Sequence, residues 1–138
     1  MRSDPPNARF WSGPIINRQQ AVTITRVAGL VVASVGIAFL LITTGTVTVH
    51  GSVVSAVFLL SGAFLIVQPN RLSAAITLSL VGLVTVSSVL GPTIVALTSG
   101  VQHVALAAFL VALVSLPAAW LQMRAFRAAL ALQRGFAD

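Results

Sequence analysis

Long runs of apolar residues, interrupted by few polar positions, dominate the 138-residue chain. Four such runs can be delimited, and they cover Val27–Val49, Ser52–Val67, Leu72–Gly91 and Val101–Met123. A bilayer core about 30 Å thick is crossed by about 20 helical residues. Because irregular backbone cannot satisfy its polar groups in lipid, the pattern predicts four transmembrane helices joined by short connections.

Helix-breaking residues support these boundaries. Gln68–Arg71 form a polar turn that contains a proline, and Gly91-Pro92 is expected to stop or kink the third helix. The second run has only 16 residues, which is short for a span. The first turn can instead be placed at Gly45-Thr46, which moves His50 into the second helix.

Composition excludes a soluble domain. Hydrophobic residues make up 57% of the chain and charged residues only 7%, whereas soluble domains carry about 25% charged residues. There is no cysteine, so the chain has no disulfide and no thiolate metal site. The predicted fold class is therefore an all-α, polytopic membrane protein with four transmembrane helices.

The charges predict the orientation of the chain. All eight basic residues are arginines, and they lie before the first run, between the second and third runs, and after the fourth run. Four spans bring all of these positions to one side of the membrane. By the positive-inside rule, we expect both termini in the cytoplasm and the protein in the cell inner (plasma) membrane. Phe10, Trp11 and Trp120 fit an aromatic belt at that interface.

Three segments follow from this topology: a cytoplasmic N-terminal strap at 1–26, a four-helix transmembrane bundle at 27–123, and a cytoplasmic amphipathic tail at 124–138. The strap is not a cleavable signal peptide, because prolines and arginines break its apolar stretches. The prolines favour an extended strap that a partner orders, and a disordered tail with an aromatic anchor is the alternative.

The tail can continue the fourth helix, with a basic face formed by Arg124, Arg127 and Arg134. Such a face is expected to meet anionic lipid headgroups, and an acidic cytoplasmic partner is the alternative. Nucleic acid is not expected as a partner, because the eight arginines form no continuous stripe.

Small residues recur at helical spacing in the fourth run, at Ala105, Ala108, Ala112, Ser115 and Ala119. Weaker stripes occur in the other runs: Gly29, Ala33 and Gly36 in the first, Ser52, Ala56 and Gly62-Ala63 in the second, and Ala75, Ser79 and Gly82 in the third. Transmembrane helices associate through faces of this kind. The stripes predict helix packing, either inside the bundle or against another protein.

Candidate chemistry is sparse. No charged residue lies inside any of the four runs, and the only carboxylate side chains are Asp4 and Asp138. This argues against proton relays and against paired-carboxylate catalysis. His50 and His103 both fall near the predicted outer surface, where they are expected to bond loop carbonyls or water. Two imidazoles are a poor metal or haem site, so we expect no metal and no cofactor.

The sequence favours a non-enzymatic accessory or scaffold subunit that packs against a larger integral membrane complex, such as a transporter permease or an envelope or respiratory assembly. Its expected partners are other integral membrane subunits and anionic lipid. The alternative is a small homo-oligomeric channel or a carrier of lipophilic molecules. An enzyme would require a role in turnover for the two histidines.

Overall fold

The computed structural model describes residues 11–43, 49–100 and 102–135. These residues form four helices and no strand: α1 (Arg18–Thr43), α2 (Val49–Val67), α3 (Arg71–Ser99) and α4 (Gln102–Arg134). The all-α prediction is confirmed. Two of the helices, over Arg18–Leu41 and Arg71–Thr98, are long and apolar enough to cross a membrane, whereas the apolar stretch Ser52–Val67 of α2 is shorter.

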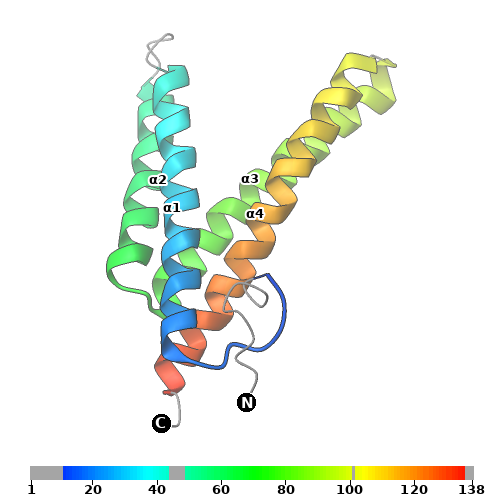
Figure 1. Cartoon of the computed structure of the whole chain (residues 1–138). Coiled ribbons are helices and arrows are strands. Elements are labelled where there is room, and N and C mark those ends of the chain that lie inside the picture. Colours follow the sequence, from blue (N-terminus) through cyan, green and yellow to red (C-terminus); the bar gives the residue numbers. More distant parts are fainter. Residues whose placement is uncertain (1–10, 44–48, 101, 136–138) are drawn as a thin grey trace.

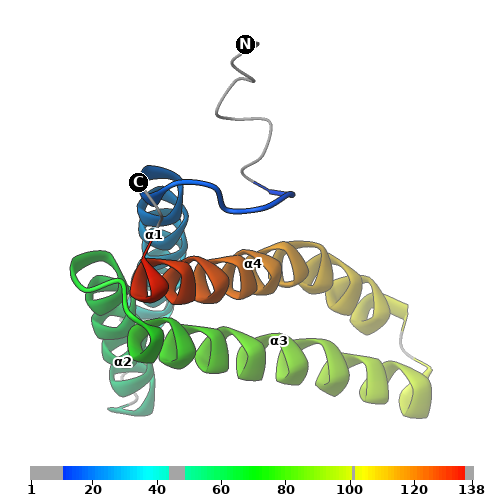
Figure 2. The same ribbon diagram turned by 90° about the horizontal axis from the view of Figure 1, so that it is seen from below.

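The helices form two antiparallel hairpins that diverge like the arms of a V (Figure 1). One hairpin pairs α1 with α2 and the other pairs α3 with α4, and the contact between hairpins runs mainly between α1 and α4. The hairpins meet at the end where α1 and α3 begin and α2 and α4 end, which we call the arginine end. Seen from below, α3 and α4 extend well away from the first hairpin (Figure 2).

Helix α1 begins at Arg18, nine residues before the predicted first span. Asn17 caps it, because its Oδ1 accepts a hydrogen bond of 2.7 Å from the Gln20 backbone N–H, while Gln20 Oε1 accepts from the Ile16 N–H at 3.1 Å. The predicted strap at 1–26 is thus helical from residue 18 onward. In the described part, only residues 11–17 remain extended or turning.

The third helix is longer than its predicted span. Asn70 and Ser73 form a capping box at its start, and Gly100 ends it in the left-handed conformation with φ of 65°. Between these caps the helix continues through Pro92. The prediction of a break at Gly91-Pro92 was therefore wrong if read as a stop.

Helix α4 likewise continues through Pro117 and ends only at Arg134. The predicted tail from residue 124 is thus the last part of α4, as the basic helical face suggested. At the other boundary, His50 lies in α2, as expected if the turn falls at Gly45-Thr46. The turn residues 44–48 themselves lie outside the described residues.

The best-packed core lies at the arginine end. Nine apolar side chains from all four helices are buried there: Ala21, Ile24, Ala28, Leu65, Ala74, Leu121, Ala125, Ala128 and Ala129. A second, smaller cluster of Val32, Phe58 and Val81 marks the point where the hairpins part. Farther out, large apolar side chains are exposed on every helix.

Candidate functional site

The two hairpin helices α1 and α2 approach each other to backbone contact. A Cβ added at Gly62 would lie 2.6 Å from the Gly29 carbonyl oxygen and 2.7 Å from the Ala33 nitrogen. A Cβ at Gly36 would lie 2.9 Å from the Leu59 nitrogen. The stripe formed by Gly29, Ala33 and Gly36 therefore faces α2, and a larger side chain there would force the helices apart.

The weaker stripe predicted in the third run does not form a seam in the described structure. Ser79 is exposed, and a Cβ added at Gly82 would meet no atom within 4 Å. The buried face of α3 instead carries Thr77, Val81 and Thr85. The hydroxyls of Thr77 and Thr85 donate to carbonyls of their own helix, those of Ser73 and Val81 respectively. Because such polar side chains can be buried in this way, hydropathy and residue size did not predict that this face of α3 is the buried one.

The small-residue stripe of α4 lies partly in the core between the hairpins. Ala119 packs beside the cluster of Val32, Phe58 and Val81. Ala112 and Ser115 are partly buried, and the buried Ser115 Oγ has no hydrogen-bond partner. The side chains of Ala105 and Ala108 lie outside the described residues.

Gln122 is a functional candidate that sequence reasoning missed. Its side chain is fully buried, and Nε2 donates a hydrogen bond of 3.0 Å to the Ala28 carbonyl across the α1–α4 contact. Its Oε1 is buried with no hydrogen-bond partner. The signal was present in the sequence, because Gln122 follows Ala119 by three residues and so continues the same helical stripe.

Two hydrogen bonds tie the segment before α1 to helix α4. Trp120 donates from Nε1 to the Trp11 carbonyl at 3.1 Å, and Arg124 donates from a terminal guanidinium nitrogen to the Gly13 carbonyl at 3.1 Å. Arg124 is only 5% exposed. It therefore holds the strap against α4 instead of extending freely from a basic face. Phe10 lies outside the described residues.

The other described arginines are exposed and gather toward the arginine end: Arg18 and Arg26 on α1, Arg71 on α3, and Arg127 and Arg134 on α4. The chain has only two carboxylate side chains, Asp4 and Asp138, and both lie outside the described residues. These two carboxylate side chains are too few to pair with most of the eight arginines.

The two histidines lie on different hairpins. His50 falls in α2 and His103 in α4, but the side chains of both lie outside the described residues. Among the residues that are described, no group of three or more His, Cys, Asp or Glu side chains is placed to hold a metal ion.

Comparison of the chain with models of protein families, with curated proteins and with solved structures finds no match. The class of protein is therefore defined by the fold alone. It is an all-α protein of two helical hairpins, and two of its helices are long and apolar enough to cross a membrane.

Proposed function

We propose that all four helices cross the cell inner membrane, with the arginine end in the cytoplasm. Two features support this orientation. The arginines among the described residues lie toward one end of the helices, and the only charged residue in the sequence between positions 27 and 123 is Arg71 at the start of α3. Positively charged segments are retained on the cytoplasmic side, and the far ends of the hairpins carry no charge that would resist translocation.

The contacts between α1 and α4 mark the membrane boundary. Gln122 lies beside Ala28, so Arg26 and Arg124, each two residues nearer the arginine end, lie at a similar height. Beyond that height toward the far end, the described helices carry no charged residue. We infer that this level is the inner headgroup layer, with Trp11 and Trp120 beside it in the interfacial belt.

Helix length explains why the hairpins diverge in a bilayer. Helix α2 has 19 residues and α3 has 29, which correspond to about 28 Å and about 43 Å at 1.5 Å per residue. The bilayer core is about 30 Å thick. The first hairpin fits it while nearly upright, whereas the longer second hairpin fits by tilting.

Within the membrane, we propose a non-enzymatic accessory or scaffold subunit that packs against other integral membrane subunits. The observation that carries this proposal is the divergence of the hairpins. The small-residue face of α4 continues past the cluster of Val32, Phe58 and Val81 with Ala112 and Ser115, which are partly buried, while large apolar side chains of both arms are exposed. Small residues are the feature with which a transmembrane helix packs closely against another.

The test is site-specific cross-linking from this face in native membranes. Because the chain has no cysteine, Ala112→Cys and Val114→Cys each introduce a single attachment point on α4. Val114 is 75% exposed and serves as the matched control. We expect one discrete cross-linked protein from position 112 and diffuse or no products from position 114.

A second variant tests the same contact by size. The protein identified by cross-linking from position 112 is now co-purified with the chain in mild detergent, without cross-linking. Ala112→Leu should reduce its recovery by about tenfold, because packing of small residues is lost. Val114→Leu should leave recovery unchanged. Equal recovery with both variants would contradict the subunit proposal, and substrate-specific flux through purified protein in liposomes would favour the alternative of a channel or lipophile carrier.

A further inference from the structure

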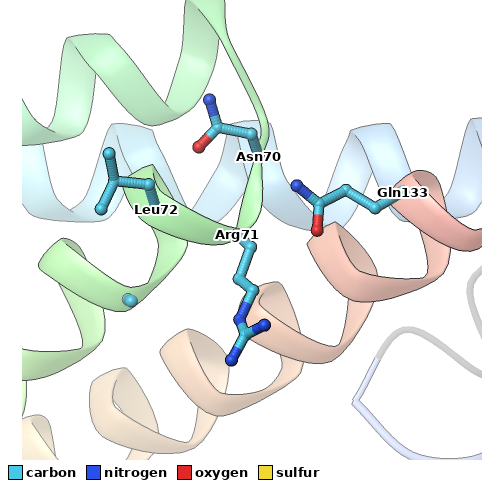
Figure 3. A pocket seen from close by; sticks show the side chains of 5 residues that line it. Asn70, Arg71, Leu72 and Gln133 are labelled. Atoms are coloured by element: carbon cyan, nitrogen blue, oxygen red, sulfur yellow. The ribbon is translucent and has the colours of Figure 1, made fainter.

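A hollow of about 420 Å³ lies at the arginine end, between the beginning of α3 and the end of α4. Its lining comprises Asn70, Arg71, Leu72, Ala75 and Gln133. Figure 3 shows Asn70, Arg71 and Gln133 projecting around it from two segments that are far apart in the sequence. The lining thus combines three polar side chains with the apolar Leu72 and Ala75.

The polar side chains of the lining offer hydrogen-bond donors. Asn70 is engaged in capping α3, because its Oδ1 accepts from the Ser73 N–H at 2.8 Å. The side chains of Arg71 and Gln133 form no hydrogen bond or ion pair with the described residues. A guanidinium presents five donors in a planar fork, which suits a phosphate oxygen pair, and the glutamine amide adds two more.

An apolar stripe leads away from the hollow along α3. It is formed by exposed side chains at steps of a helical period, namely Leu72, Ile76, Leu83, Val86, Leu90 and Ile94. From Leu72 to Val86 the helix rises about 21 Å. The cation and the amide at one end of this stripe suit the headgroup of a lipid, and the apolar side chains of the stripe suit its acyl chain. The two adjacent surfaces therefore match the two parts of an amphipathic lipid.

We propose that this hollow is a binding site for an anionic glycerophospholipid, with the phosphate held by Arg71 and Gln133 and an acyl chain lying along the α3 stripe. The inference rests on the proposed membrane insertion, in which Arg71 lies at the inner headgroup layer. It assigns a defined lipid position to Arg71, whereas Arg18, Arg26, Arg127 and Arg134 are not among the residues that line this hollow.

The experiment measures lipid retention by the full chain. Protein reconstituted with phosphatidylglycerol and phosphatidylcholine in equal amounts is returned to mild detergent and analysed by native mass spectrometry. We expect one retained phosphatidylglycerol, and Arg71→Gln should lower its retention about tenfold because a charge-assisted contact is lost. Gln133→Leu should cause a smaller loss. Arg127→Gln, which removes the same charge from a position that does not line the hollow, should change retention less than about twofold.

The outcomes distinguish a defined lipid site from diffuse attraction and from a free-phosphate site. Equal losses with Arg71→Gln and Arg127→Gln would mean diffuse attraction and would overturn the site. Displacement of the lipid by inorganic phosphate alone would identify a free-phosphate site and would also overturn it. Helical circular dichroism and recovery in the membrane fraction are measured for each variant. A wild-type chain in the membrane fraction without retained lipid refutes only the site, whereas its absence from that fraction refutes the proposed membrane insertion.

Discussion

Gln122 shows how one residue departs from the apolar pattern around it. It is fully buried at the contact between α1 and α4, and of its two amide atoms only Nε2 has a hydrogen-bond partner. The Ala28 carbonyl lies within α1, where it already accepts a hydrogen bond from the backbone of its own helix. The bond from Gln122 is therefore a second bond to a carbonyl that is satisfied without it. We infer that the amide fixes the register between the two helices more than it stabilises them.

This inference predicts a small effect on stability for one substitution of Gln122 and a large effect for another. Gln122→Leu removes both the donor and the buried Oε1 without a partner, so the free energy of unfolding should change by less than about 1 kcal/mol. Gln122→Glu removes the donor and adds a buried carboxyl group, so stability should fall by about 2 kcal/mol or more. Unfolding in mixed micelles measures both variants. A larger loss for leucine than for glutamate would refute the register role.

The sequence predicted the number of helices more accurately than it predicted the residues at which they begin and end. The four apolar runs correspond to four helices, but hydropathy placed the start of the first at residue 27, because Arg18 and Arg26 interrupt the apolar pattern before it. The helix starts at the Asn17 cap instead, and Ala21, Ile24 and Ala28 supply a buried face. A capping signal, asparagine followed three residues later by glutamine, was readable in the sequence.

The prolines illustrate a different limit. Pro92 lacks the N–H that would bond the preceding turn, yet α3 continues to Ser99. The Thr93 hydroxyl donates to the Val89 carbonyl at 2.6 Å in the same turn. In lipid, a helix is the only local conformation that satisfies the backbone, so the proposed environment outweighs the local propensity. Which faces pair between hairpins depends on three-dimensional packing and could not be derived from residue size, as Gly82 demonstrates.

The α1–α2 contact yields a prediction with an internal control. Gly62→Ala places a methyl group 2.6 Å from the Gly29 carbonyl oxygen, so the helices must separate, and we expect a loss of about 1–3 kcal/mol in the free energy of unfolding. Gly82→Ala meets no atom within 4 Å and should not destabilise the fold, since alanine favours helix. Thermal unfolding of both variants in one detergent makes the comparison. Equal losses would exclude backbone contact as the cause.

In the proposed orientation, water surrounds the arginine end of the molecule and lipid surrounds the rest, and this difference accounts for the V shape of the whole molecule. Seven of the nine core residues come from α1 between Ala21 and Ala28 and from α4 between Leu121 and Ala129. The core lies at the arginine end, where, in the proposed orientation, water makes burial of apolar surface favourable. Farther out, lipid solvates Leu, Val and Ile as well as another helix does. The arms are therefore free to diverge, and their exposed apolar side chains, including Leu41 and Leu97, need no cover from the chain itself.

Single-cysteine labelling of intact spheroplasts tests this membrane placement most directly. Thr98→Cys near the far end of α3 and Gln133→Cys at the arginine end each introduce the only thiol of the chain, and both positions are exposed. A membrane-impermeant maleimide added outside the spheroplasts should label position 98 at once and position 133 only after the membrane is permeabilised. Labelling of position 133 before permeabilisation, or of both positions equally, would contradict a cytoplasmic arginine end.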